Sequence, residues 1–143
     1  MIDNILSALI WIPIISGLLI LFYNNKHSYL NIINISINLF VFILSILLLV
    51  SFNKNISDFQ FIENFNWIPS LNIFYYLGVD AISVLLIVLN TLIFFIVSLY
   101  NSTLKIKKRT HYYASFLIAN GLTIGVFSAI DAILFYIFFE ALL

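Results

Sequence analysis

Long apolar runs separated by short polar segments dominate the chain. Four of them cover approximately residues 5–23, 30–52, 80–100 and 111–130, and a fifth begins near residue 131 and continues to 143. A helix rises about 1.5 Å per residue, so a hydrocarbon core of about 30 Å requires about 20 residues per crossing. The pattern therefore predicts four complete membrane-spanning helices and an incomplete fifth.

Helices are favoured over strands for all of these runs. Backbone polar groups inside a bilayer must be hydrogen-bonded within the protein, and the runs lack the alternation over about ten residues that marks membrane β-strands. The predicted fold class is all-α, a polytopic membrane helix bundle. No internal repeat or linker divides the chain, so residues 1–143 are interpreted as the N-terminal part of a single membrane domain.

The composition supports a membrane protein and narrows its chemistry. Hydrophobic residues make up 64% of the chain, charged residues make up 8%, and the mean hydropathy is +1.15. A soluble domain contains about 25% charged residues, and the zero net charge gives no basis for a nucleic-acid partner. Because the chain has no cysteine and its histidines, His27 and His111, are far apart, we expect no disulfide, metal site or cofactor in this segment.

The basic residues predict the orientation of the spans. Four of the six lie in one loop between the third and fourth spans: Lys105, Lys107, Lys108 and Arg109. The positive-inside rule places this loop, and the earlier turn that contains Lys26, in the cytoplasm. The N-terminus and the long connection over residues 53–79 are then expected on the periplasmic side.

This long connection combines a proline with aromatic residues. Pro69 interrupts any helix there. Trp67, Tyr75 and Tyr76 are suited to the level of the lipid headgroups. We therefore expect a non-helical segment at the membrane surface.

Polar residues within the second and third spans repeat on one face of each helix. At 100° per residue, each set falls within a sector of about 60°. The sets are Asn31, Asn34, Asn38 and Ser45 in the second span, and Asp80, Ser83, Thr91 and Ser98 in the third. Such faces are expected to point into protein, where they form interhelical hydrogen bonds or, alternatively, line a hydrated path.

Small residues recur in the fourth span. Gly121 and Gly125 form a small-xxx-small step that Ala129 continues. Steps of this kind allow two helix backbones to approach closely. We expect this face of the fourth span to pack against a neighbouring helix.

Glu140 is the ionisable residue that lies deepest in an apolar run. It follows the start of the fifth span by nine residues, or about 13 Å, which places it near the bilayer midplane. An ionisable group there costs at least about 2.5–3.5 kcal/mol and is typically paired, protonated or part of an ion pathway. We interpret Glu140 as a group that loads and releases a proton; a neutral glutamate that only hydrogen-bonds a neighbour is the alternative.

A cationic partner for Glu140 is missing from the chain. All six Lys and Arg residues lie in loops or at span edges. A helix that ended at Leu143, inside the bilayer, would also leave its last carbonyls without partners. We therefore expect the polypeptide to continue, and the partner to come from later residues or another subunit.

Three other titratable residues lie at span ends. Asp80 and Asp131 precede the third and fifth spans, where a carboxylate caps a helix N-terminus. Asp131 and Glu140 are nine residues apart and therefore lie on opposite faces of a helix. His111 is expected at the cytoplasmic interface beside the basic loop, with a role in proton relay as the alternative.

Two segments resemble a known family. Residues 67–69 and 77–86, WIP and LGVDAISVLL, are similar to the W-x-P and L-G-[VI]-D-G-[IL]-S-L-L-L of the antiporter-like subunit M family of NADH:quinone oxidoreductase, respiratory complex I. Residues 125–140, GVFSAIDAILFYIFFE, are similar to that family's G-V-F-x-A-x-D-x-x-L-F-Y-x-F-W-E. Ala81 and Phe139 depart from the family's Gly and Trp but keep small and aromatic character.

The resemblance implies a proton-translocating subunit in the membrane arm of complex I in a bacterial inner membrane. Its partners would be the other membrane-arm subunits, the lipid bilayer and protons. Glu140 would correspond to the family's fifth-span glutamate, which pairs with a lysine on a later, discontinuous helix. Two alternatives stay open: a related subunit of a multisubunit cation/proton antiporter or membrane-bound hydrogenase, and a truncated product without function.

Overall fold

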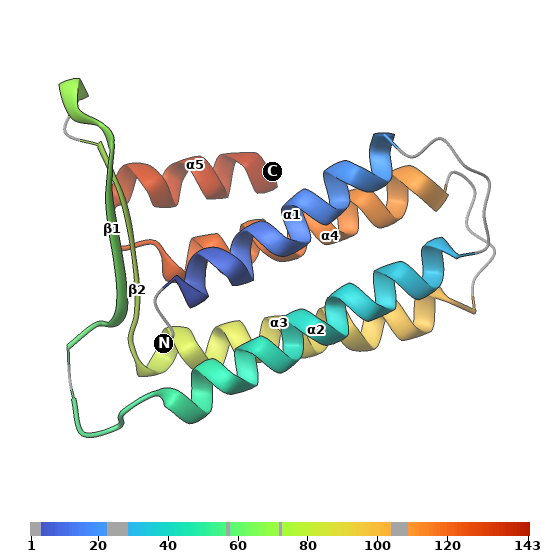
Figure 1. Cartoon of the computed structure of the whole chain (residues 1–143), viewed down its shortest axis with the longest axis horizontal. Coiled ribbons are helices and arrows are strands. Elements are labelled where there is room, and N and C mark those ends of the chain that lie inside the picture. The colour runs from blue at the N-terminus through green and yellow to red at the C-terminus, as the bar shows by residue number, and fades with distance from the viewer. Residues whose placement is uncertain (1–3, 23–28, 57, 72, 104–108) are drawn as a thin grey trace.

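The computed structural model describes residues 4–22, 29–56, 58–71, 73–103 and 109–143. Helices predominate, and a β-hairpin interrupts them (Figure 1). The elements in chain order are α1 (Ile5–Phe22), α2 (Leu30–Ser51), β1 (Gln60–Ile68), the short 3₁₀ helix η1 (Pro69–Leu71), β2 (Ile73–Val79), α3 (Ala81–Asn101), α4 (Arg109–Ser128) and α5 (Ala132–Leu142).

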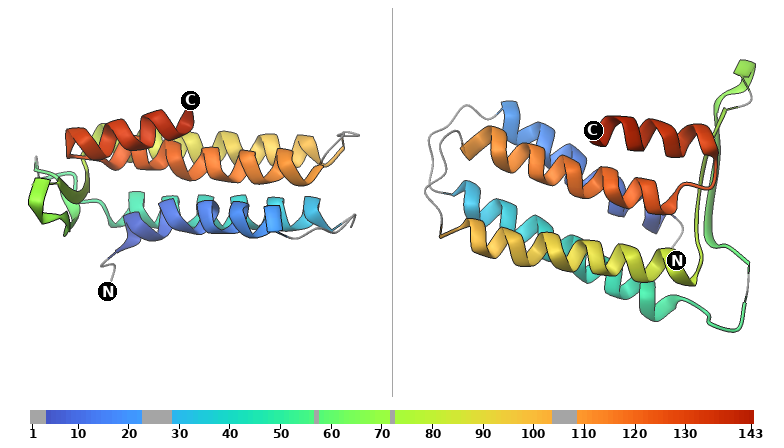
Figure 2. Two further views of the ribbon diagram at one scale, coloured as in Figure 1. Left: turned by 90° about the horizontal axis from the view of Figure 1, so that it is seen from above. Right: turned by 180° about the vertical axis from the view of Figure 1, so that it is seen from behind.

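The helices run side by side in two layers. Figure 2 shows α1 and α2 in one layer, with α3, α4 and α5 in the other. The hairpin crosses one end of the bundle, and the C-terminal ends of α1 and α3 and the N-terminal ends of α2 and α4 lie at the opposite end (Figure 1). Since α5 starts beside the hairpin and has 11 residues, it ends part-way along the bundle.

Three of the described helices are long and apolar enough to cross a membrane: α1, α2 and α3. These correspond to the first three predicted spans. α4 has 20 residues and packs along α1, but His111, Asn120 and Thr123 contribute to a more polar composition. The fourth complete span is therefore not confirmed and stays a prediction, and α5 is a shorter apolar helix.

The prediction of an all-α fold is wrong for the connection between α2 and α3. Strands β1 and β2 pair antiparallel there, with Phe65 opposite Tyr75 and Asn66 opposite Phe74. Aromatic and branched residues favour strands, and the segment that contains Pro69 forms the turn. The expectation that this segment is not α-helical is confirmed.

The most extensive helix–helix contact joins α1 to α4. A Cβ atom at Gly121 would lie 2.5 Å from the backbone oxygen of Ile10 and 2.6 Å from Cγ1 of Ile14. A Cβ atom at Gly125 would instead lie 2.8 Å from the ring of Phe138 in α5. The predicted small-residue face is confirmed, and its two glycines contact two different helices.

Large apolar side chains cover much of the outer surface. Phe22 is 85% exposed, Val50 is 77% exposed and Ile82 is 68% exposed. Soluble monomers rarely expose contiguous apolar patches this extensive. The surface is consistent with contact to lipid or to other apolar helices.

Candidate functional site

Glu140 lies on the face of α5 that points away from the bundle. The opposite face of the helix is buried and carries Leu134 and Phe138. Phe138 packs on Gly125 of α4. Glu140 follows Phe138 by two residues, which is about 200° around the helix, and its side chain is exposed. Tyr136 lies one turn earlier on the same helix, and its hydroxyl interacts with the Glu140 carboxyl.

The cations among the described residues lie far from this carboxyl along the bundle. Lys54 follows α2 at the hairpin end, and Arg109 begins α4 at the other end. Lys26, Lys105, Lys107 and Lys108 fall outside the described residues. That the cationic partner of Glu140 comes from later residues or another subunit stays a prediction.

The two aspartates predicted to cap helices do so. The Asp80 carboxylate accepts from the backbone N–H of Ser83 at 2.7 Å. Hydrogen bonds from the side chain and backbone of Ser83 lower the pKa of Asp80. Asp131 accepts from the N–H groups of Ile133 and Leu134 at 2.8 and 3.1 Å. The capping interpretation is confirmed for both residues.

His111 lies in the first turn of α4 and is exposed. Arg109, two residues earlier, begins the same helix. The end of the bundle opposite the hairpin therefore holds both residues. The proposed alternative, a role in proton relay, stays a prediction.

Asn34 and Asn38 of the predicted α2 face belong to a chain of amides in the interior of the bundle. Asn90 of α3 donates from Nδ2 to Oδ1 of Asn120 in α4 at 3.0 Å. Asn120 donates to Asn38 of α2 at 2.9 Å, and Asn38 donates to Asn34 at 3.1 Å. Three helices are thus joined by four carboxamides, of which Asn34, Asn38 and Asn120 are fully buried.

A second polar contact joins the predicted faces of α2 and α3 nearer the hairpin. The Ser45 and Thr91 hydroxyls are 2.7 Å apart, and both residues are buried. The expectation that these faces point into protein is confirmed. Asn90 and Asn120 were missed by the sequence analysis, although a lone amide in an apolar run is itself a signal of an internal partner.

Glu63 is a buried carboxylate that the sequence analysis did not identify. Only 5% of its surface is exposed. It accepts from the N–H of Leu6 at 2.9 Å, from the N–H of Ser7 at 3.2 Å and from the Ser7 hydroxyl. Glu63 of the hairpin thus satisfies free N–H groups in the first turn of α1, where the helix dipole also favours an anion.

Two further side chains continue this contact. The Tyr75 hydroxyl lies 3.1 Å from the Ser7 hydroxyl and accepts from Nε1 of Trp11 at 3.1 Å. Burial raises the pKa of Tyr75, so its phenol stays protonated at neutral pH. The cluster of Glu63, Ser7, Trp11 and Tyr75 fastens the hairpin to the start of α1.

A bulge in β1 directs Glu63 towards α1. The strand register shifts between Gln60 and Glu63, and Phe61 has a φ of 55°. A positive φ is uncommon for a non-glycine residue. The bulge bends the strand and re-aims the side chain that follows.

The other side of the hairpin is fixed to the α4–α5 junction. The N–H of Ile130 donates to the carbonyl of Tyr76 at 3.0 Å, and Leu77 forms a β-bridge with Ala129. The hairpin therefore holds the hairpin-side ends of α1, α4 and α5. Since Glu140 is nine residues beyond Asp131, this attachment sets the distance of Glu140 from the hairpin along α5.

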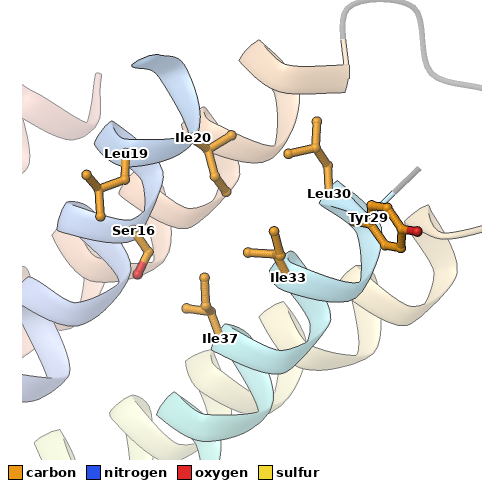
Figure 3. A pocket seen from close by; sticks show the side chains of 7 residues that line it. All are labelled: Ser16, Leu19, Ile20, Tyr29, Leu30, Ile33 and Ile37. Atoms are coloured by element: carbon orange, nitrogen blue, oxygen red, sulfur yellow. The ribbon is translucent and has the colours of Figure 1, made fainter. Parts of the chain in front are cut away.

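A pocket of about 300 Å³ opens between α1 and α2 near the end opposite the hairpin. Figure 3 shows its seven lining side chains, mainly aliphatic: Ser16, Leu19, Ile20, Tyr29, Leu30, Ile33 and Ile37. The Ser16 hydroxyl donates to the Ile12 carbonyl at 2.6 Å. The pocket suits an apolar group, and its lining offers no carboxylate or cation for chemistry.

Comparison with known proteins identifies relatives of the chain. No family model matches it. NADH-ubiquinone oxidoreductase chain 4 of Arabidopsis thaliana is 34% identical over 139 residues, covering 96% of the chain. NADH-quinone oxidoreductase subunit M of Rickettsia typhi is 34% identical over 149 residues, covering 97% of the chain. Chain 4 of Marchantia polymorpha is 32% identical over 139 residues, again covering 96%.

The similarity runs along almost the whole chain but over a minor part of each relative. The chain spans 28% of the Arabidopsis protein, 30% of the Rickettsia protein and 28% of the Marchantia protein. The resemblance noted from residues 67–86 and 125–140 agrees with these matches. The chain therefore belongs to the family of NADH-quinone oxidoreductase subunit M and NADH-ubiquinone oxidoreductase chain 4.

Proposed function

We propose that this chain is part of a proton-translocating membrane-arm subunit of NADH:quinone oxidoreductase. Electron transfer elsewhere in the complex would drive proton movement through this subunit. The observation that carries the proposal is the position of Glu140, a carboxyl on an apolar helix that faces away from its own bundle. The kinship with subunit M and chain 4 supports the same role.

Glu140 is the group that would bind and release the proton. An approaching cation stabilises the carboxylate and favours release, whereas withdrawal of the cation favours proton binding. The outward face of α5 leaves room for a helix that carries this cation. The Tyr136 hydroxyl, one turn earlier on α5, is placed to interact with this carboxyl.

The setting proposed for the chain is a bacterial inner membrane, with the other membrane-arm subunits as its partners. The N-terminus and hairpin would lie on the periplasmic side and the α3–α4 connection in the cytoplasm, as the basic residues predict. We expect no flavin, iron–sulfur cluster or quinone-reducing residue in this segment. The redox chemistry would belong to other subunits.

Replacement of Glu140 in the full-length protein within its complex tests the proposal. Glu140→Gln removes the ionisable group and keeps the shape of the side chain. Proton pumping driven by NADH oxidation, measured in sealed membrane vesicles, should be abolished or severely reduced. Near-normal pumping would refute the role of Glu140.

Asp131→Asn is the matched control on the same helix. It makes the same change from carboxyl to amide, and asparagine also caps helices well. Pumping should therefore stay close to that of the unmodified protein. Equal losses in both variants would point to damage to α5 and would count against a specific role for Glu140.

A further inference from the structure

Three buried amide atoms on α2 and α3 have no hydrogen-bond partner among the described residues. They are Oδ1 of Asn31, Nδ2 of Asn34 and Nδ2 of Asn101. Asn34 is fully buried and Asn101 is 3% exposed. Leaving such a group unpaired costs about 1–3 kcal/mol, so a partner of matching chemistry is favoured.

The three residues lie at the same end of the bundle. Asn31 and Asn34 are three positions apart on α2 and therefore share a face. Nδ2 of Asn31 donates to the carbonyl of Ser102, the residue after Asn101, at 3.4 Å. The carbonyl of Asn101 accepts from the buried Tyr113 hydroxyl at 3.4 Å, so α2, α3 and α4 enclose this site.

Asn34 is the last residue of the amide chain, and its unpaired atom is the donor Nδ2. Its Oδ1 already accepts from Asn38, so its Nδ2 is the last donor of the chain. Nδ2 of Asn38 also donates to the backbone carbonyl of Asn34 at 2.9 Å, which fixes the Asn38 amide, so exchanging the terminal atoms of Asn34 would place its NH₂ against the NH₂ of Asn38. The orientation is therefore fixed, and the NH₂ of Asn34 needs an acceptor.

The required ligand must accept from two donors and donate to one acceptor. Two NH₂ groups repel a cation, and neutral amides do not offset the desolvation of an anion. Water accepts and donates equally well, and buried water typically makes about three hydrogen bonds to otherwise unsatisfied groups. Water is the ligand whose hydrogen-bonding chemistry matches all three atoms.

We propose that ordered water binds between α2, α3 and α4 at the end of the bundle opposite the hairpin. The water accepts from Asn34 and Asn101 and donates to Asn31. It extends the amide chain, which begins at Asn90 near the middle of α3, towards Asn101 at the end of α3. With this water, hydrogen-bonded polar groups continue through the interior of this half of the bundle. The proposal does not depend on any role of Glu140.

Water-to-amide magnetisation transfer in solid-state NMR tests the proposal. The full-length protein is reconstituted in bilayers with ¹⁵N-labelled asparagine. The side-chain amides of Asn34 and Asn101 should receive magnetisation from water. The Asn120 amide, equally buried but bonded to Asn38, is the internal control and should receive little.

A variant locates the water. Asn31→Leu removes the acceptor, so transfer to Asn34 should fall strongly, whereas Asn90→Leu at the far end of the chain should leave that transfer unchanged. If Asn31→Leu does not fold, the unmodified protein alone still decides. Transfer to Asn34 and Asn101 no stronger than transfer to Asn120 would overturn the proposal.

Discussion

Glu63 shows how one side chain joins two elements distant in sequence. Its carboxylate accepts three donors from Leu6 and Ser7, which are 56 or 57 positions earlier. No local pattern predicts this contact, because two of the donors are backbone N–H groups that every non-proline residue carries. Burial of the carboxylate depends on the bulge at Phe61, which is a feature of the strand pairing.

Removal of this carboxylate should loosen the hairpin. Glu63→Ala leaves the N–H groups of Leu6 and Ser7 without a partner, so we expect a loss of about 1–3 kcal/mol in the free energy of unfolding. Glu63→Gln keeps one acceptor oxygen and should cost less. Unfolding of the protein by SDS in mixed micelles measures both changes.

Asn64→Ala is the control for these variants. Asn64 is the next residue in β1, and its side chain is exposed, so this change should alter stability by less than about 0.5 kcal/mol. Equal stability of Glu63→Ala and Asn64→Ala would contradict the capping role. The experiment is independent of pumping.

Glu140, in contrast to Glu63, could be identified from the sequence because the pattern around it is local. A single carboxylate in the apolar run of α5 is conspicuous, and its energetic cost is a property of the bilayer. Its surroundings were less predictable. The exposure of Glu140 follows from the packing of Phe138 on Gly125, which depends on where α4 lies.

At the scale of elements, periodicity predicted the helices and the faces that meet inside the bundle. The asparagines of α2 were expected on one face, and three helices share the resulting amide chain. The hairpin was not predicted as a hairpin, because its aromatic residues were assigned to the headgroup level and its bulge breaks strict alternation. Strand pairing is a long-range property that a single run of residues does not specify.

The α1–α4 contact should depend on the absence of a side chain at Gly121. Glycine to alanine inside a helix ordinarily stabilises by about 1 kcal/mol. Here the added Cβ would meet the backbone of Ile10 at 2.5 Å, so Gly121→Ala should destabilise by about 1–3 kcal/mol. Thermal unfolding in nanodiscs measures this change. A lower unfolding temperature for Gly121→Ala, in place of the usual increase, is the expected result.

Ser115→Ala in the same helix provides the comparison. Ser115 is exposed, and alanine has the higher helix propensity, so this change should be neutral or slightly stabilising. A stabilising effect of Gly121→Ala would mean that α1 and α4 separate without cost. That outcome would contradict the close approach described above.

At the scale of the whole molecule, the alternation of the helices places the hairpin at one end of the bundle and the C-terminal end of α3 at the other (Figure 1). The basic residues predict the orientation of the helices relative to the membrane. Most of these basic residues lie outside the described residues. The extensive apolar surface follows from composition alone. The parts of this surface that contact lipid depend on neighbouring helices. The pattern of one apolar run does not predict them.

The orientation is testable because the chain has no native cysteine. Asn64→Cys on the hairpin and Thr103→Cys after α3 each introduce one thiol at an exposed position. A membrane-impermeant maleimide should label Asn64→Cys from the periplasmic side and Thr103→Cys only in inverted vesicles. Labelling of both from one side would contradict the antiparallel spans.

The buried amide chain also has an electrical consequence. Each carboxamide has a dipole directed from its oxygen to its nitrogen, and from Asn90 to Asn34 every nitrogen donates to the next oxygen. Head-to-tail dipoles add and polarise one another. The summed dipole has its negative end at Asn90, near the middle of α3, and its positive end at Asn34, so these neutral side chains favour positive charge on the Asn90 side.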